Sequence, residues 1–317
     1  LIVAAAMADC SERAADEAQR LVPLVEDWGA VVEEAVRQGL LPVVYRYLAG
    51  HGKGVVPQAV MNDLRMRYHG AVAGNIRLID QLFSVMSLLQ GHGIGVMPYK
   101  GPVMSSQLYG DPCLRPCCDV DFLVRMADAQ RARDLLVEAG YEPEVSVGPR
   151  QEGIYLRQQC EYTLRRRNTG VAVELHWAIA QKAASFGFDA ASLWDDPVGA
   201  TVEGREVPTV APAKMLLVMA IHNGAKHQWE RLLWVIDFAR LISRVRLPWQ
   251  EVMALARRLG MRRSVVVGSI LARDVAGIAL PAELEEAAGA APVAARLADH
   301  IAERRFDGGA PVGKMAP

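Results

Sequence analysis

The sequence predicts a mixed α/β (α+β) fold, in which a small sheet-containing core lies between helical N-terminal and C-terminal segments. Apolar residues recur at three- and four-residue spacings before residue 91 and again from Pro212 onward, which is the period of helices. Between these regions, short runs of alternating polar and apolar residues are typical of strands. We therefore expect a helical segment over residues 1–90, the α/β core over 91–180, a helical domain over 181–307 and a disordered tail over 308–317.

Composition excludes several classes of protein. The chain has 317 residues, with 35 basic and 36 acidic side chains and a net charge of −1, whereas binding to extended nucleic acid usually requires a basic surface. No uncharged apolar run approaches the roughly 20 residues of a membrane span, so we expect no membrane partner. The odd count of five cysteines favours reduced thiols and a cytoplasmic location.

The elements follow from the hydrophobic pattern. Leu78, Leu82, Val85 and Leu89 form an apolar stripe on one long helix that ends near Gly91. The core then reads as a strand, a helix, a strand, a helix and a hairpin, at residues 94–99, 101–108, 119–124, 127–139 and 158–179. Helices are expected next at residues 215–221, 232–242, 252–259 and 262–278, with breaks at the prolines 248 and 281.

Two aspartates carry the strongest chemical signal. Alternate side chains of a strand share a face, so Asp119 and Asp121 point the same way, while the apolar residues between and after them enter the core. Two carboxylates about 7 Å apart on one strand face repel each other and favour a bound cation. Mg²⁺ takes carboxylate oxygens and keeps positions for substrate phosphates. The alternative for an isolated Asp-x-Asp is a solvated strand end.

The strand predicted over residues 171–179 supplies a third carboxylate. Glu174 and His176 share one face of this strand, opposite Val173 and Leu175. If the strand lies beside the aspartates, Glu174 completes a cluster able to hold two metal ions for in-line phosphoryl displacement, or serves as a general base. His176 could orient Glu174 or contact substrate, and a purely structural role is equally open.

A phosphate-binding turn is expected at Lys100-Gly101-Pro102, between a strand and a helix. Gly101 permits close backbone approach, the helix start offers free N–H groups, and Lys100 adds a positive charge. Ser105 is a further candidate contact. Each signal is weak alone, because Lys-Gly is a common turn and Ser105 is equally plausible as a plain helix residue.

Two other basic residues are candidates for nucleotide contact. Arg115 lies four residues before Asp119 and could bind a phosphate, the alternative being a salt bridge to Asp111 or Asp119. Lys226 follows His222 by four residues, which places both on one face of a helix. From there Lys226 could reach a triphosphate.

These motifs together resemble a bacterial family of uncharacterised nucleotidyltransferases within the polymerase-β-like superfamily. The resemblance runs from about residue 20 to residue 275, with the motifs in order. It rests on the segments 100–102, 108–112, 119–124, 140–141, 173–177 and 222–232, with Arg115 and Asp237.

The resemblance implies a polymerase-β-like nucleotidyltransferase core and transfer of an NMP from an NTP to an acceptor, with release of pyrophosphate. ATP is the expected donor and Mg²⁺ the expected ion, with Mn²⁺ as an alternative. The resemblance places the metal carboxylates at Asp119 and Asp121, with Glu174 as the third acid. The Gly-Ser pair of the wider superfamily is absent and Lys100-Gly101-Pro102 stands in its place, so phosphate contacts cannot be copied from relatives.

Other functions fit parts of the pattern. A regulatory or degenerate module could bind a nucleotide without turnover, but it has no need of three carboxylates. A metal-dependent phosphodiesterase usually uses several histidines, and only His176 lies near the cluster in sequence. A partner-bound protein, such as half of a toxin–antitoxin pair, would leave no sequence mark. The acceptor could be a small molecule such as an antibiotic, a peptide, a protein side chain or an RNA end.

Overall fold

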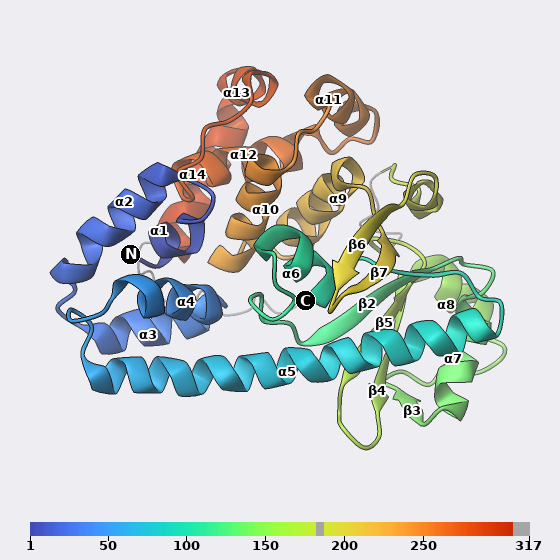
Figure 1. The fold of residues 1–317 in the computed structure, drawn as a ribbon. Coiled ribbons are helices and arrows are strands. Elements are labelled where there is room, and N and C mark those ends of the chain that lie inside the picture. The colour runs from blue at the N-terminus through green and yellow to red at the C-terminus, as the bar shows by residue number, and fades with distance from the viewer. Residues whose placement is uncertain (182–186, 307–317) are drawn as a thin grey trace. The chain divides into compact units, whose positions relative to one another are not determined.

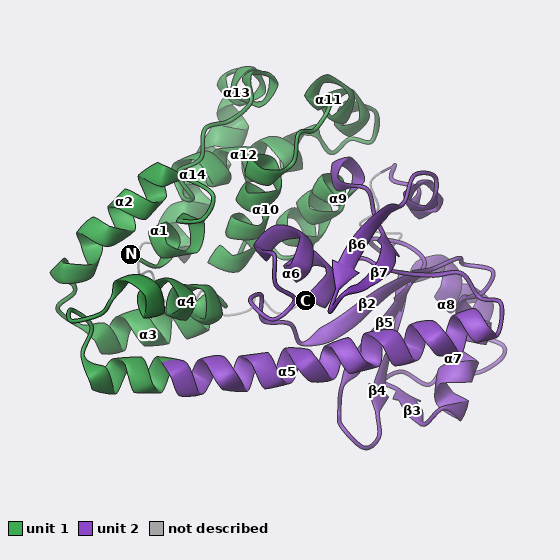
Figure 2. Cartoon of the chain, viewed as in Figure 1, with its two compact units in different colours: residues 1–64, 215–317 green, residues 65–214 purple. Residues whose placement is uncertain are grey.

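The computed structural model describes residues 1–181 and 187–306 (Figure 1), so the predicted disordered tail lies outside the described residues. The chain forms two compact units (Figure 2). Unit 1 comprises residues 1–64 and the chain from residue 215 onward, and unit 2 comprises residues 65–214. These limits differ from the three segments expected from sequence, whose boundaries stay a prediction.

Unit 1 is helical among its described residues. Its first helices are α1 (Ile2–Met7), α2 (Glu12–Leu21), η1 (Val22–Leu24), α3 (Trp28–Arg37), α4 (Leu41–His51) and the start of α5 (Gln58–Gly91). The later ones are most of α9 (Pro212–Met219), then η4 (Ala220–Lys226), α10 (Leu232–Arg244), α11 (Trp249–Arg258), α12 (Arg262–Asp274), α13 (Ala282–Gly289) and α14 (Pro292–Arg305). Pro248 and Pro281 directly precede α11 and α13, which confirms the predicted breaks.

A partly buried ion-pair network joins the segment after α1 to α10 within unit 1. The Asp9 carboxylate accepts hydrogen bonds from Arg240 and Arg244, each at 2.5 Å. Arg240 is fully buried and also donates to the Ala6 carbonyl. These arginines hold the pKa of Asp9 below its usual value although burial opposes its ionisation.

The segment expected as an α-helix around His222 and Lys226 is a π-helix, η4. Its last bond runs from the His227 N–H to the His222 carbonyl, five residues back, at 3.2 Å. The wider turn places the rings of His222 and His227 4.7 Å apart. The expectation that His222 and Lys226 share one face stays a prediction.

Unit 2 contains a five-stranded sheet of order β1-β2-β5-β4-β3, in which β2 and β5 are parallel and the other pairs antiparallel. Its strands are β1 (Val96–Pro98), β2 (Asp119–Val124), β3 (Tyr141–Pro143), β4 (Glu161–Arg166) and β5 (Ala172–His176). Its helices after α5 are α6 (Gly101–Tyr109), α7 (Ala129–Glu138), α8 (Glu152–Gln158) and η3 (Ala190–Trp194). The predicted α/β core with helical segments is thereby confirmed.

One face of the sheet forms the hydrophobic core with α5 and α7. Leu82 and Leu89 of α5, Leu136 of α7, Val120 of β2 and Leu175 of β5 are all buried there. Since side chains alternate along a strand, the polar residues of β2 and β5 face away from this core. Burial of one apolar face therefore fixes which residues can form a site on the other.

Two local elements differ from the expectation. The predicted strand start at Gln158 is the last residue of α8, and β4 begins at Glu161. A hairpin of β6 (Val198–Val202) and β7 (Arg205–Thr209) lies in the region expected to be helical. Its turn residues, Glu203 and Gly204, both have positive φ angles, of 48° and 73°, which suits a tight two-residue hairpin turn.

Helix α5 alone, within the described residues, is long and apolar enough to cross a membrane by length and composition. Its qualifying stretch has a mean hydropathy of 1.2 and is 39% buried. Leu78, Ile79 and Val85 of this helix lie in the core of unit 2, and a core helix passes the same test. This feature is weak evidence for a span, and the expected absence of a membrane partner stays a prediction.

Candidate active site

The pairing of β2 with β5 brings the predicted carboxylates together. The two strands are parallel, with Asp121 opposite Glu174 and Leu123 opposite His176. Val120 and Val173, which alternate with the carboxylates, are fully buried on the core face. The condition on which the three-carboxylate hypothesis depended, adjacency of these two strands, is therefore met.

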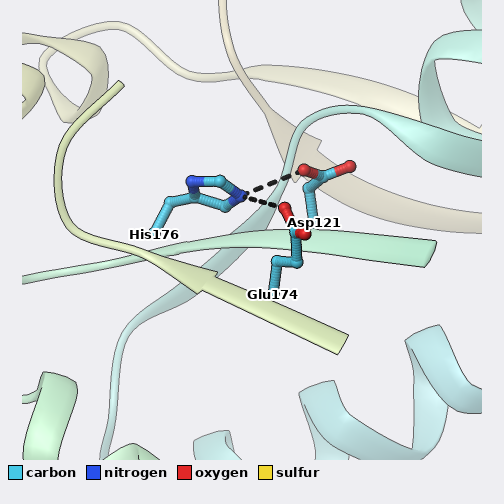
Figure 3. Close-up of side chains that lie close together, drawn as sticks. All are labelled: Asp121, Glu174 and His176. Atoms are coloured by element: carbon cyan, nitrogen blue, oxygen red, sulfur yellow. Dashed lines mark hydrogen bonds and ion pairs between the residues drawn. The ribbon is translucent and has the colours of Figure 1, made fainter. Parts of the chain in front are cut away.

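Three side chains point toward one another at this strand pair (Figure 3). The His176 Nε2 atom lies 3.0 Å from Asp121 Oδ1 and 3.0 Å from Glu174 Oε2. One ligand atom from each residue falls within 4.8 Å of the others, which makes this the one group of three or more potential metal ligands found among the described residues. The side chains of His176 and Asp121 are almost fully buried, whereas that of Glu174 is 21% exposed.

Asp119 lies outside this tight group, although it shares its electrostatic environment. Burial, together with the charges of Asp121 and Glu174, raises the pKa of Asp119 to about 7. For Asp121, burial is outweighed by Lys100 and His176, which hold its pKa well below the usual range. Burial and the neighbouring carboxylates thus disfavour the ionised form of Asp119, and a cation bound beside it would favour that form.

Lys100 reaches the same carboxylate from the neighbouring strand. Strand β1 runs antiparallel to β2, and the Tyr99 N–H donates to the Asp121 carbonyl at 3.3 Å. This pairing brings Lys100, two residues after the end of β1, next to Asp121. Its Nζ donates to Asp121 Oδ1 at 2.7 Å. Although burial opposes protonation, Asp121 raises the pKa of Lys100. In this structure Lys100, which was expected to bind phosphate, forms an ion pair with the Asp121 carboxylate.

Gly101 permits a close approach of two backbone segments. Its φ is +58°, and a Cβ at this residue would lie 3.2 Å from the Asp119 carbonyl oxygen. The neighbour is therefore strand β2 itself. Helix α6 therefore begins, at Gly101, in close contact with the backbone of Asp119. Direct contact of Gly101 with a phosphate stays a prediction.

Ser105 and Arg115 are linked to each other. The Ser105 hydroxyl is fully buried, donates to the Asp111 carbonyl at 2.6 Å and accepts from the Arg115 N–H at 3.0 Å. Asn75, which sequence reasoning missed, donates to the Arg115 carbonyl at 2.7 Å. Ser105 thus holds the loop that carries Arg115, and its contact with a ligand stays a prediction.

The charge of Arg115 helps to lower the pKa of Asp119, against the stronger effects of burial and the other carboxylates. Its guanidinium also lies 3.6 Å from the Cys117 sulfur. Lys226 belongs to unit 1 and is exposed there. The predicted contacts of Arg115 and Lys226 with a nucleotide therefore stay predictions.

Glu161 is a fourth carboxylate at the site that sequence reasoning missed. Its Oε2 lies 3.0 Å from His176 Nδ1, off the line of an ideal hydrogen bond. The antiparallel register pairs Arg165 with Ala172 and Glu161 with His176. The sequence did contain a signal for Glu161. The predicted hairpin turn sets the register of the two strands, and that register determines which residue lies opposite His176.

Burial alone would lower the pKa of His176, but its contacts with Asp121, Glu161 and Glu174 raise it to about 10. The imidazole is therefore cationic near neutral pH when no other cation is present. The donor set of carboxylates and imidazole suits a divalent ion, which would supply the same charge.

Three solved structures are similar to parts of the chain. Lincosamide antibiotic adenylyltransferase LnuA, lincomycin-bound, has a TM-score of 0.35 and 16% identity, covering 51% of this chain and 94% of its own. ANT(2")-Ia in complex with adenylyl-2"-tobramycin has a TM-score of 0.42 and 9% identity, covering 58% and 97%. An antigenic nucleotidyltransferase-like protein from Paracoccidioides brasiliensis has a TM-score of 0.35 and 18% identity, covering 60% and 92%.

Sequence comparison is more informative. None of the curated proteins matches the chain. The family described as "Uncharacterised nucleotidyltransferase" matches residues 25–277, which is most of the chain and includes the whole carboxylate site. This match confirms the resemblance drawn from the motifs: the chain belongs to the uncharacterised nucleotidyltransferase family.

Proposed function

We propose that the protein is a metal-dependent nucleotidyltransferase that moves an NMP, AMP from ATP in the first instance, to a hydroxyl or phosphate of an acceptor. The observation that carries this proposal is the parallel β2–β5 register, which sets Glu174 opposite Asp121 on the face that also carries Asp119. Mg²⁺ is the expected ion, held by these three carboxylates. When bound, the ion neutralises phosphate charge and lowers the pKa of the attacking hydroxyl.

The protein side chains have distinct parts in the transfer. The acceptor oxygen attacks the α-phosphorus, the bond to the β-phosphate oxygen breaks, and pyrophosphate leaves. Glu174 is the most exposed of the three clustered side chains and accepts the proton of the acceptor hydroxyl. Lys100 and Arg115 offer positive charge to the phosphates, Gly101 sets the start of α6, and Ser105 positions the Arg115 loop.

A second candidate is a nucleotide-binding module without turnover. It is favoured by one observation: Lys100 and His176 both contact Asp121 Oδ1, so the cluster carries cations of its own. In that case the site needs no divalent ion. Neither candidate identifies the acceptor, which can be a small molecule, a peptide or protein, or an RNA end; the balanced net charge disfavours extended nucleic acid.

Calorimetric titration of each of the four NTPs, with and without Mg²⁺, separates the two candidates. We expect Mg²⁺-dependent binding of one NTP that the Asp119→Asn/Asp121→Asn variant loses. Asp80→Asn, at an exposed position of α5 in the same unit, is the matched control and should bind like the wild type. Binding that needs no Mg²⁺ and survives the double substitution would support the module without turnover.

A further inference from the structure

The tightest potential ligand group of the site includes an imidazole and excludes the first aspartate. Asp121, Glu174 and His176 each offer an atom within 4.8 Å of the others. His176 Nε2 is equally close, at 3.0 Å, to an oxygen of each carboxylate. One imidazole nitrogen therefore faces the point on which both carboxylates converge (Figure 3).

The other nitrogen of the same ring faces Glu161. The Nδ1 atom lies 3.0 Å from Glu161 Oε2, on the adjacent antiparallel strand β4. Histidine ligands of metals usually donate their second N–H to a carboxylate or carbonyl, which fixes the tautomer and the ring orientation. When a metal ion displaces the Nε2 proton, a proton kept on Nδ1 beside Glu161 leaves the Nε2 lone pair facing Asp121 and Glu174.

We propose that His176 is itself a metal ligand through Nε2, with Asp121 and Glu174, and that Glu161 is the positioning residue that orients it. The inference rests on the proposed function, because it concerns the ion of that same site. An imidazole in the donor set favours a first-row transition ion over Mg²⁺, whereas carboxylates and water alone suit Mg²⁺. The site should therefore bind Mn²⁺ more tightly than Mg²⁺.

The strand register explains why the two residues act together. Glu161 and His176 are direct partners across β4 and β5, so their Cβ atoms share one face of the sheet. Tyr99 packs edge-on against the imidazole, with ring centroids 5.5 Å apart. The ring is almost fully buried and is held on one side by Tyr99, which leaves its two nitrogens directed at carboxylates.

The test uses Mn²⁺ as a paramagnetic probe of the full chain. Pulsed electron paramagnetic resonance of bound Mn²⁺ should show ¹⁴N coupling from the imidazole in the wild type. His176→Ala should abolish this coupling and reduce the preference for Mn²⁺ over Mg²⁺ measured by calorimetry. Glu161→Gln should lower Mn²⁺ affinity by roughly 10- to 100-fold, the usual effect of losing an outer partner of a ligand.

The matched control is Glu142→Gln, which removes an exposed carboxylate from β3 of the same sheet, paired with Arg167. It should leave both the coupling and the affinities unchanged, and circular dichroism checks the folding of every variant. Mn²⁺ binding without ¹⁴N coupling, or a coupling that survives His176→Ala, would overturn the inference while leaving a metal-dependent transferase intact. Absence of binding by both ions, with and without NTP, would overturn the inference together with the proposed function.

Discussion

Lys100 Nζ and Asp121 Oδ1 are 2.7 Å apart, with the two side chains only 12% and 4% exposed. Removing Lys100 takes away one of the two cations that contact the buried Asp121 carboxylate and leaves only His176. Lys100→Met should therefore destabilise the metal-free protein by on the order of 3 kcal/mol, measured by chemical denaturation in EDTA. Added Mn²⁺ should restore part of the loss, and Lys53→Met, at an exposed lysine, should change little. An unchanged denaturation midpoint for Lys100→Met would show that the pair adds no stability.

A side chain at position 101 is expected to destabilise the fold. Its φ of +58° disfavours a side chain, and a Cβ would lie 3.2 Å from the Asp119 carbonyl. Gly101→Ala should cost about 1–3 kcal/mol of unfolding free energy. The control is Gly91→Ala at the end of α5, where nothing lies within 4 Å of the added methyl group. Equal stability of the two variants would contradict the strained contact with β2.

The raised pKa of Asp119 predicts a pH dependence of stability. Its pKa is about 7 in the fold and 3.8 as an ordinary aspartate. An acid whose pKa is raised on folding contributes stability that is present below its unfolded pKa and lost as pH rises through the folded value. In EDTA, raising the pH from 5 to 7.5 should reduce the stability of the wild type by roughly 2 kcal/mol more than that of Asp119→Asn.

His176 titrates in a different window and must be separated from this effect. Its pKa is raised from 6.5 to about 10, so its contribution is present below pH 6.5 and lost as pH rises through about 10. Both proteins in the comparison keep His176, so the difference between them isolates Asp119. Parallel stability profiles for wild type and Asp119→Asn would contradict the proposed crowding of carboxylates.

Asp9 is expected to hold α1 in unit 1. Without it, the fully buried Arg240 loses its carboxylate partner. Asp9→Ala should cost roughly 1–3 kcal/mol, a range that allows for the 35% exposure of the Asp9 side chain. Asp16→Ala, at an exposed position of α2, is the control for loss of an acidic side chain. Thermal unfolding of both variants measures the difference, and equal melting temperatures would contradict the network.

The sequence predicted the parts of the fold that depend on local pattern. Strand β2 begins and ends where the alternation of Asp119–Val124 placed it, and α5 ends at Gly91 as expected. The face shared by Glu174 and His176 followed from the same two-residue period. Predicting such features requires only the spacing of apolar residues along the sequence and the identity of the turn residues.

The remaining features depend on contacts that are distant in the sequence. Glu161 joins the site only through the register of β4 with β5, and Lys100 pairs with Asp121 only because β1 runs antiparallel to β2. The burial of Ser105 depends on its bonds to the 111–115 loop. The π-helix adds one residue to a turn, which apolar spacing alone did not distinguish from an α-helix.

The central claim is transfer of a nucleoside monophosphate at the Asp119, Asp121 and Glu174 site. The most direct measurement incubates the protein and divalent metal with ATP labelled at either the α- or the γ-phosphate, together with a pool of small-molecule and RNA acceptors. We predict that α-label enters a product, that γ-label is released as pyrophosphate, and that Asp119→Asn/Asp121→Asn does neither. Entry of γ-label into the product, or transfer undiminished in the double variant, would contradict the account.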